Sequence, residues 1–123
     1  MKTITIIIIM FLAKVDYTVY NALPSQTDNT PTVTASLHEI NSLLVANGQE
    51  KTLAVSPALK NRLGLEFEDE VLVCKCTEPI YNGWWIVRDL MNERYKNNID
   101  FLVPNDVKLG KGSCVIQEIY NKK

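Results

Sequence analysis

Two aspartates in the second half of the chain are the residues best placed for chemistry. Asp89 and Asp100 lie in the stretch IVRDLMNERYKNNIDF, residues 86–101, where each adjoins apolar, strand-like residues on one side of a polar loop. Shielding from water or a nearby like charge raises the pKa of a carboxyl group. Ile99 and Phe101 flank Asp100 and fit the shielding requirement, and Asp89 can supply the like charge. Two carboxylates in unlike environments are the pattern of a general acid/base site.

A structural role explains the same two aspartates. An aspartate at a strand end often accepts hydrogen bonds from backbone N–H groups of the following turn. The sequences RDLMN around Asp89 and NNID before Asp100 suit such turns. The sequence therefore leaves catalysis and turn formation open for both residues.

Short strands and small helices have to position this pair. The sequence TLAVSPALKNRLG predicts a strand followed by a helix, in which Ser56 caps the helix, Pro57 takes its first position and Gly64 ends it. A second short helix is predicted after Ser36, ending at Asn47-Gly48. Further strands are expected at 17–20, 32–35, 70–76, 84–89, 99–103 and 113–120. This pattern predicts an all-β fold with short helices, a small closed or partly closed barrel.

The inward faces of these strands define the expected core. The residues predicted to be mostly buried are Leu53, Val55, Leu72, Ile86, Val87, Leu102, Val115 and Ile116.

Composition excludes several classes of function. A chain of 123 residues is normally one domain, and its net charge of -1 offers no basic surface for nucleic acid or an anionic membrane. The single histidine and three cysteines lack the spacing of a zinc site, so neither a metal nor another cofactor is expected.

The cysteines are spaced for a strand. Cys74 and Cys76 are two residues apart, which places them on one face of a strand. In an oxidising compartment one of them can bridge to Cys114, and otherwise all three serve as small apolar side chains.

The N-terminal segment is apolar. Residues 1–14 have the outline of a signal peptide, which predicts export, and are too short to span a bilayer comfortably. The β-branched run at 3–9 equally suits a buried strand. The sequence thus divides into this segment and one domain over residues 15–123.

Four stretches together resemble a known family. They are TLAVSPAL, LGLEFEDEVLV, YNGWWIVRDLMNERYKNNIDFLVP and LGKGSCVIQEI, and they are similar to the three-aspartate (3D) domain. That domain is shared with membrane-bound lytic transglycosylase A and is related to RlpA-like domains. The upstream TVYNALPSQTDNTPTVTAS looks like the opening strand and loop of its phage-type and cell-wall-associated forms. The resemblance covers nearly everything after about residue 15.

The resemblance implies a fold and an activity. The fold is a six-stranded double-psi β-barrel, and the activity is non-hydrolytic cleavage of peptidoglycan glycan strands. The second family aspartate corresponds to Asp89 and the third, the catalytic acid/base, to Asp100. Ser56 stands at the first aspartate position, and Leu90-Met91 replace a glycine pair.

Lytic cleavage needs a single carboxyl group. It protonates the glycosidic oxygen and then, as a base, takes the proton of the sugar's C6 hydroxyl while that oxygen closes on the anomeric carbon. The internal hydroxyl replaces the nucleophile or activated water of hydrolytic glycosidases.

A sugar-binding surface needs aromatic faces and polar side chains. Trp84, Trp85 and Tyr95 are the aromatic candidates, and because Trp84 and Trp85 point to opposite faces, at most one lines a groove. The polar candidates for substrate binding are Arg94, Gln26, Asp28 and Ser56. A solvated loop charge explains Arg94, turn formation explains Gln26 and Asp28, and helix capping explains Ser56.

The leading expectation is thus an exported, cell-wall-directed enzyme whose partner is peptidoglycan. A phage-encoded enzyme of this kind fits the same expectation. The alternative is a catalytically silent barrel that binds glycan or serves as a structural part of a larger assembly such as a phage virion. A third reading is an endoglucanase-like hydrolase on the same barrel.

Overall fold

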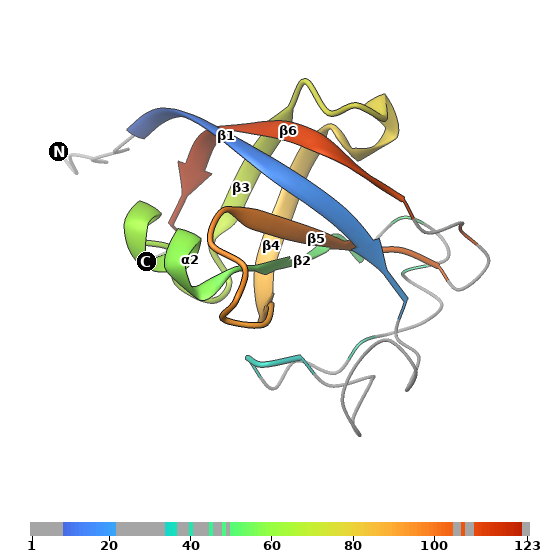
Figure 1. Cartoon of the computed structure of the whole chain (residues 1–123), viewed down its shortest axis with the longest axis horizontal. Coiled ribbons are helices and arrows are strands. Elements are labelled where there is room, and N and C mark those ends of the chain that lie inside the picture. The colour runs from blue at the N-terminus through green and yellow to red at the C-terminus, as the bar shows by residue number, and fades with distance from the viewer. Residues whose placement is uncertain are drawn as a thin grey trace, which may run out of the picture.

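The chain folds into a closed barrel of six strands (Figure 1). The computed structural model describes residues 9–21, 34–36, 40, 45, 48, 50–104, 107 and 110–121, with the backbone alone for residues 9–12. The predicted all-β, six-stranded barrel is confirmed. Its strands, in the ring order β1-β5-β2-β4-β3-β6, are β1 Ile9–Tyr20, β5 Asn98–Leu102, β2 Thr52–Val55, β4 Gly83–Leu90, β3 Glu70–Cys74 and β6 Lys111–Tyr120.

The ring mixes parallel and antiparallel pairs. Strands β1 and β5 run parallel, as do β2 and β4, whereas the other four neighbouring pairs are antiparallel. Parallel neighbours require crossover connections instead of tight hairpins.

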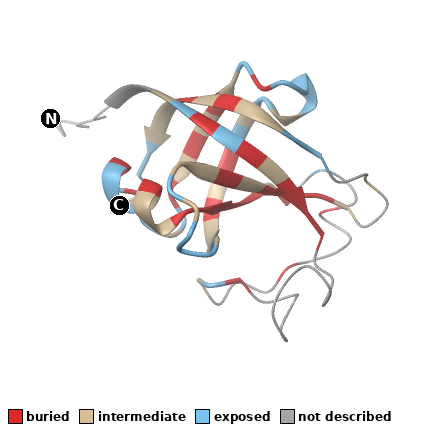
Figure 2. Ribbon diagram, in the orientation of Figure 1, coloured by how far each residue is buried: buried red, intermediate tan, exposed pale blue. Residues whose placement is uncertain are grey.

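Alternating side chains fill the interior, as the alternating buried segments of the strands show (Figure 2). At its centre the Phe101 ring packs against Tyr17, Tyr81 and Trp85. Five of the residues predicted to be mostly buried are confirmed as buried: Leu53, Val55, Val87, Leu102 and Ile116. The prediction is wrong for three, because Leu72, Ile86 and Val115 alternate with core residues, point outward and are only partly covered.

The helix after β2 follows the sequence prediction with one correction. Helix α2 spans Pro57–Leu63, and Gly64 ends it with φ 66°, the left-handed conformation that favours glycine. Ser56 occupies the cap position, but its side chain makes no cap hydrogen bond. Its Oγ instead accepts a hydrogen bond from the backbone N–H of Asn98 at 3.3 Å, which ties the helix start to β5.

The cysteines separate because β3 ends earlier than predicted. The strand stops at Cys74, and Lys75 has φ 53°, so the chain turns between the two cysteines. The expectation that Cys74 and Cys76 share a strand face is therefore wrong. Cys76 is buried and bridges to Cys114, whereas Cys74 stays a free, partly exposed thiol.

The first strand begins before the domain boundary expected from the sequence. Strand β1 starts at Ile9, and its backbone pairs Ile9 with Ile119 and Ala13 with Ile116. Residues 9–14 are thus part of the barrel wall. In the part of the chain that the structure describes, no helix is long and apolar enough to cross a membrane. The predicted strand at 32–35 and the helix after Ser36 fall largely outside the described residues.

Candidate functional site: a carboxylate row on the outside of the barrel

Four side chains form a row across four neighbouring strands. Backbone pairing sets Thr18 of β1 beside Asp100 of β5, Asp100 beside Ala54 of β2, and Ala54 beside Asp89 of β4. Flanking residues such as Ile99 and Phe101 are buried in the core, so the row faces outward. We call this row, Thr18, Asp100, Ala54 and Asp89, the carboxylate face. The small Ala54 is the only side chain of the row that separates the two aspartates.

A β-bulge brings Asp89 into the row. Leu53 pairs with Val87, but the next residue, Ala54, pairs with Asp89, which leaves Arg88 as an extra residue in β4. Strict alternation would have sent Asp89 to the same interior face as Val87. The extra residue turns Asp89 outward, to the side of the barrel where Asp100 lies.

Asp100 is a half-buried carboxyl group that accepts a hydrogen bond from a neighbouring side chain. The Thr18 hydroxyl donates a hydrogen bond to Asp100 Oδ1 at 2.8 Å. Burial raises the pKa of Asp100 to about 6, the Thr18 hydrogen bond acts in the opposite direction, and the charge of Asp89 adds to the rise. This group therefore exchanges its proton near neutral pH, as a general acid/base must.

Asp89 is surrounded by donors. Its Oδ1 accepts hydrogen bonds from the backbone N–H groups of Leu90 at 3.0 Å and Ala35 at 2.9 Å, and its Oδ2 accepts one from the Tyr20 hydroxyl at 3.3 Å. Several donors on one carboxyl group stabilise its ionised form. The two aspartates thus lie in different environments: burial raises the pKa of Asp100, whereas the Asp89 carboxyl group accepts hydrogen bonds from several donors.

Tyr20 acts only as a donor in this arrangement. Burial, followed by the charges of Asp89 and Asp100, raises its pKa well above the usual value of 10.0. The phenol stays protonated at any physiological pH, so its hydroxyl fixes the position of Asp89.

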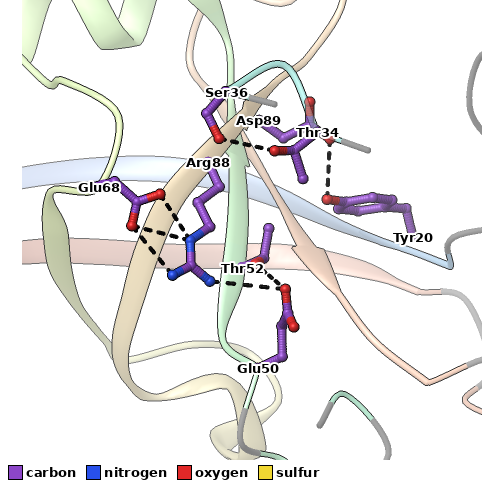
Figure 3. A network of polar contacts seen from close by, with 8 residues as sticks. All are labelled: Tyr20, Thr34, Ser36, Glu50, Thr52, Glu68, Arg88 and Asp89. Atoms are coloured by element: carbon purple, nitrogen blue, oxygen red, sulfur yellow. Dashed lines mark hydrogen bonds and ion pairs between the residues drawn. The ribbon is translucent and has the colours of Figure 1, made fainter. Parts of the chain in front are cut away.

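An ion-pair network borders the row (Figure 3). The guanidinium of Arg88, the bulge residue, lies between Glu68, with Nε to Oε1 at 3.1 Å, and the buried Glu50, with Nη1 to Oε1 at 3.8 Å. The Thr52 hydroxyl donates to Glu50 Oε1 at 3.2 Å. This network fixes the bulge and with it the orientation of Asp89.

Residues between β1 and β2 in the chain cover the row. The backbone N–H of Ser36 donates to the carbonyl of Arg88 at 3.1 Å, beside the Ala35–Asp89 hydrogen bond. An apolar cluster on the outside of the barrel adjoins these contacts, with Met91 packed against it. Its members are Tyr20, Ile40, Val45, Ala54 and Leu102. Ala54 of this cluster pairs with Asp100 in the sheet, so the cluster borders the carboxyl group whose pKa is raised by burial.

The two tryptophans lie away from the carboxylates. Trp85 is 4% exposed and packs inside the barrel, where its Nε1 donates to the Tyr81 carbonyl at 2.8 Å. Trp84 is 43% exposed, but it lies five residues before Asp89 on β4, about 16 Å along the strand. Neither ring therefore forms the wall beside Asp100 that the sequence suggested.

The other predicted substrate-binding residues divide into three groups. Arg94 and Tyr95 lie in the loop that joins β4 to β5, where the guanidinium stacks on the ring and Nη2 donates to the phenol oxygen at 2.9 Å. Ser56 is fully buried and engaged with Asn98. Gln26 and Asp28 lie outside the described residues.

The sequence analysis overlooked Thr18, Tyr20 and Glu50. The alternating stretch YTVY at 17–20 contains a signal for the first two, because Thr18 and Tyr20 share the face opposite Tyr17 and Val19. No local pattern marks Glu50, whose ion-pair partner Arg88 is far away in the sequence and comes beside it only in the fold.

Comparison with known proteins leaves the family open. No protein-family model matches the chain, and no curated protein matches it significantly. Among the residues with a described position, no group of histidine, cysteine, aspartate or glutamate side chains is arranged to hold a metal ion.

Proposed function

We propose that this chain cleaves the glycan strands of peptidoglycan without water, with Asp100 as general acid and then general base. The observation that carries the proposal is the half-buried Asp100 carboxyl group, whose pKa is raised to about 6. It shares a row with Asp89, which accepts hydrogen bonds from several donors. The resemblance to the three-aspartate domain assigns the acid/base role to the same residue.

The proposed reaction uses one carboxyl group twice. Asp100 gives its proton to the glycosidic oxygen, and the bond from that oxygen to the anomeric carbon breaks. The resulting carboxylate takes the proton of the C6 hydroxyl, whose oxygen bonds to the anomeric carbon and closes an anhydro ring. Asp100 ends protonated, as it began, and the anion at Asp89 is placed to stabilise positive charge that develops on the sugar.

Export belongs to this proposal. The Cys76–Cys114 disulfide favours an oxidising compartment, since such bridges are rare in reducing cytosol.

The test is product analysis on purified peptidoglycan. We expect glycan fragments with anhydro ends by mass spectrometry, and Asp100→Asn should lower their rate of formation by about a hundred- to ten-thousand-fold. Asp16→Asn is the matched control, because Asp16 is an exposed aspartate on the adjacent strand β1. Reducing ends in place of anhydro ends would indicate a hydrolase, and an active Asp100→Asn protein would remove Asp100 from the mechanism.

A catalytically silent, glycan-binding or structural barrel is the second candidate. Two observations favour it: Ser56 stands where the family has its first aspartate, and the chain's own donors already occupy Asp89. For this candidate, the protein sediments with peptidoglycan and leaves its fragment pattern unchanged.

A further inference from the structure

A second outer face of the barrel, formed by β4, β3 and β6, carries aromatic side chains. Backbone pairing places Trp84, Leu72 and Glu118 in one row and Ile86, Glu70 and Tyr120 in the next. All six point outward, because their neighbours along each strand, such as Val71 and Trp85, lie in the core. We call these two rows the aromatic face.

This face is open, and its polar groups have no partners among the residues that the structure describes. Trp84 is 43% exposed and Tyr120 is 48% exposed. Within the described ranges, neither the indole N–H of Trp84 nor the carboxylates of Glu70 and Glu118 make a hydrogen bond or an ion pair. The Cα atoms of Trp84 and Tyr120 lie about 12 Å apart, because the two residues are separated by two strand spacings across the sheet and by two residues along it.

We propose that the aromatic face is a glycan-binding surface, separate from the carboxylate face. A pyranose ring has apolar C–H groups that pack on an aromatic ring and hydroxyl groups that donate to carboxylates. Trp84 and Tyr120 offer the first kind of contact. Glu118, in the row of Trp84, and Glu70, in the row of Tyr120, offer the second. Two rings spaced along one side of the barrel suit an extended chain of sugars.

Charge argues against the other occupants. A second copy of the chain would bury two sets of Glu70 and Glu118 carboxylates in one interface and bring like charges together. An apolar protein surface would leave the same carboxylates buried and unpaired. Sugar hydroxyls supply donors without adding charge.

The surface does not depend on cleavage by Asp100. Asp89 and Trp84 lie at opposite ends of β4, so a substitution on one face leaves the other intact. Binding is therefore measured in the full-length Asp100→Asn protein, which keeps the glycan uncut.

The experiment is calorimetric titration with chitohexaose, a defined oligomer of N-acetylglucosamine. We expect saturable binding that Trp84→Ala weakens by about tenfold or more, since stacking on an aromatic ring is worth about 1 kcal/mol beyond the area it buries. Glu118→Gln, which keeps the shape and removes the charged acceptor, should weaken binding severalfold. Ile80→Ala is the matched control, because Ile80 is exposed and apolar but lies in the short helix η1, Pro79–Tyr81, outside the sheet.

Cys74 supplies an independent readout. It is the free thiol on the outer side of β3, two residues after Leu72, and the other two cysteines are bridged. Bound chitohexaose should slow its alkylation by iodoacetamide, and Trp84→Ala should abolish this protection.

Three results would overturn the proposal. The first is the absence of chitohexaose binding, or binding that Trp84→Ala leaves unchanged. The second is tight binding of hexalysine in its place, which would make this a surface for a basic peptide. The third is a dimer in sedimentation that Trp84→Ala dissociates, which would assign the face to a second copy. Loss of cleavage in the Asp100 variant with binding retained separates this proposal from the catalytic one.

Discussion

The carboxylate face and the aromatic face lie on the same barrel, yet they meet their surroundings in opposite ways. On the carboxylate face a cover of residues from the β1–β2 connection donates to Asp89 and packs on Ala54. On the aromatic face no described segment packs over Trp84, and Glu70 and Glu118 face solvent without partners in the described residues. The outside of a small barrel therefore offers two environments, one covered and one open.

The two faces also differ in what holds them together. The carboxylate face is held by an apolar cluster and by hydrogen bonds from residues at 34–36. Beside the aromatic face, the Cys76–Cys114 bridge links the end of β3 to β6. This difference leads to three predictions about stability and titration.

The largest expected effect is loss of the disulfide. Its cysteines are 38 residues apart, so replacing both in a Cys76→Ala/Cys114→Ala protein should lower the free energy of unfolding by about 4 kcal/mol. Urea unfolding measures this loss. Cys74→Ala is the control, because it removes only a thiol hydrogen bond to Gln117 and should cost less than about 1 kcal/mol. Equal stability of the double variant and the wild type would show that the sheet does not need the bridge.

A smaller effect is the pH dependence of the free energy of unfolding that follows from the burial of Asp100. Its folded pKa of about 6 lies above the ordinary value of 3.8, so between these values the native state binds more protons than the unfolded state. The free energy of unfolding should therefore fall as pH rises through this window and stay level above it. We expect a contribution of roughly 1 to 2 kcal/mol after allowance for solvent screening.

Comparing two variants isolates this contribution. Asp100→Asn should lack the fall, whereas Asp16→Asn, which alters an exposed aspartate, should keep it. Urea unfolding at several pH values between 4 and 7 measures the difference. A raised pKa at Asp100 would be contradicted if the stability of the wild type rose steadily over this pH range and the Asp100→Asn protein gave the same curve.

The smallest effect concerns the hydrogen bond from Thr18, which lowers the pKa of Asp100 while burial raises it. Thr18→Val removes the hydroxyl that donates to Asp100, so the pKa of Asp100 should rise further, by about one unit. Thr18→Ser keeps a hydroxyl and should leave the pKa near its present value. Carbon-detected NMR titration of the Asp100 carboxyl group distinguishes the two. An unchanged value in Thr18→Val would mean that the cover alone determines the titration.

Local sequence signals predicted much of the fold. The Pro57 and Gly64 positions located α2, and alternation located the buried Leu53, Val55 and Val87. Alternation also required Trp84 and Trp85 to face opposite sides, which the structure bears out. Prediction was wrong where a strand ended or shifted register, as at Lys75, because a single residue reverses the face of everything after it.

The sequence by itself determined that this chain forms strands with apolar inward faces and that Asp89 and Asp100 adjoin them. Only the tertiary structure decided that the two carboxylates share one outer row, since this depends on the bulge at Arg88 and on the pairing of β2 with both β4 and β5. It also decided their different environments, because two of the donors to Asp89 come from Tyr20 and Ala35, which are 69 and 54 residues away in the chain. Desolvation depends on what packs over a side chain, and distant segments supply that cover.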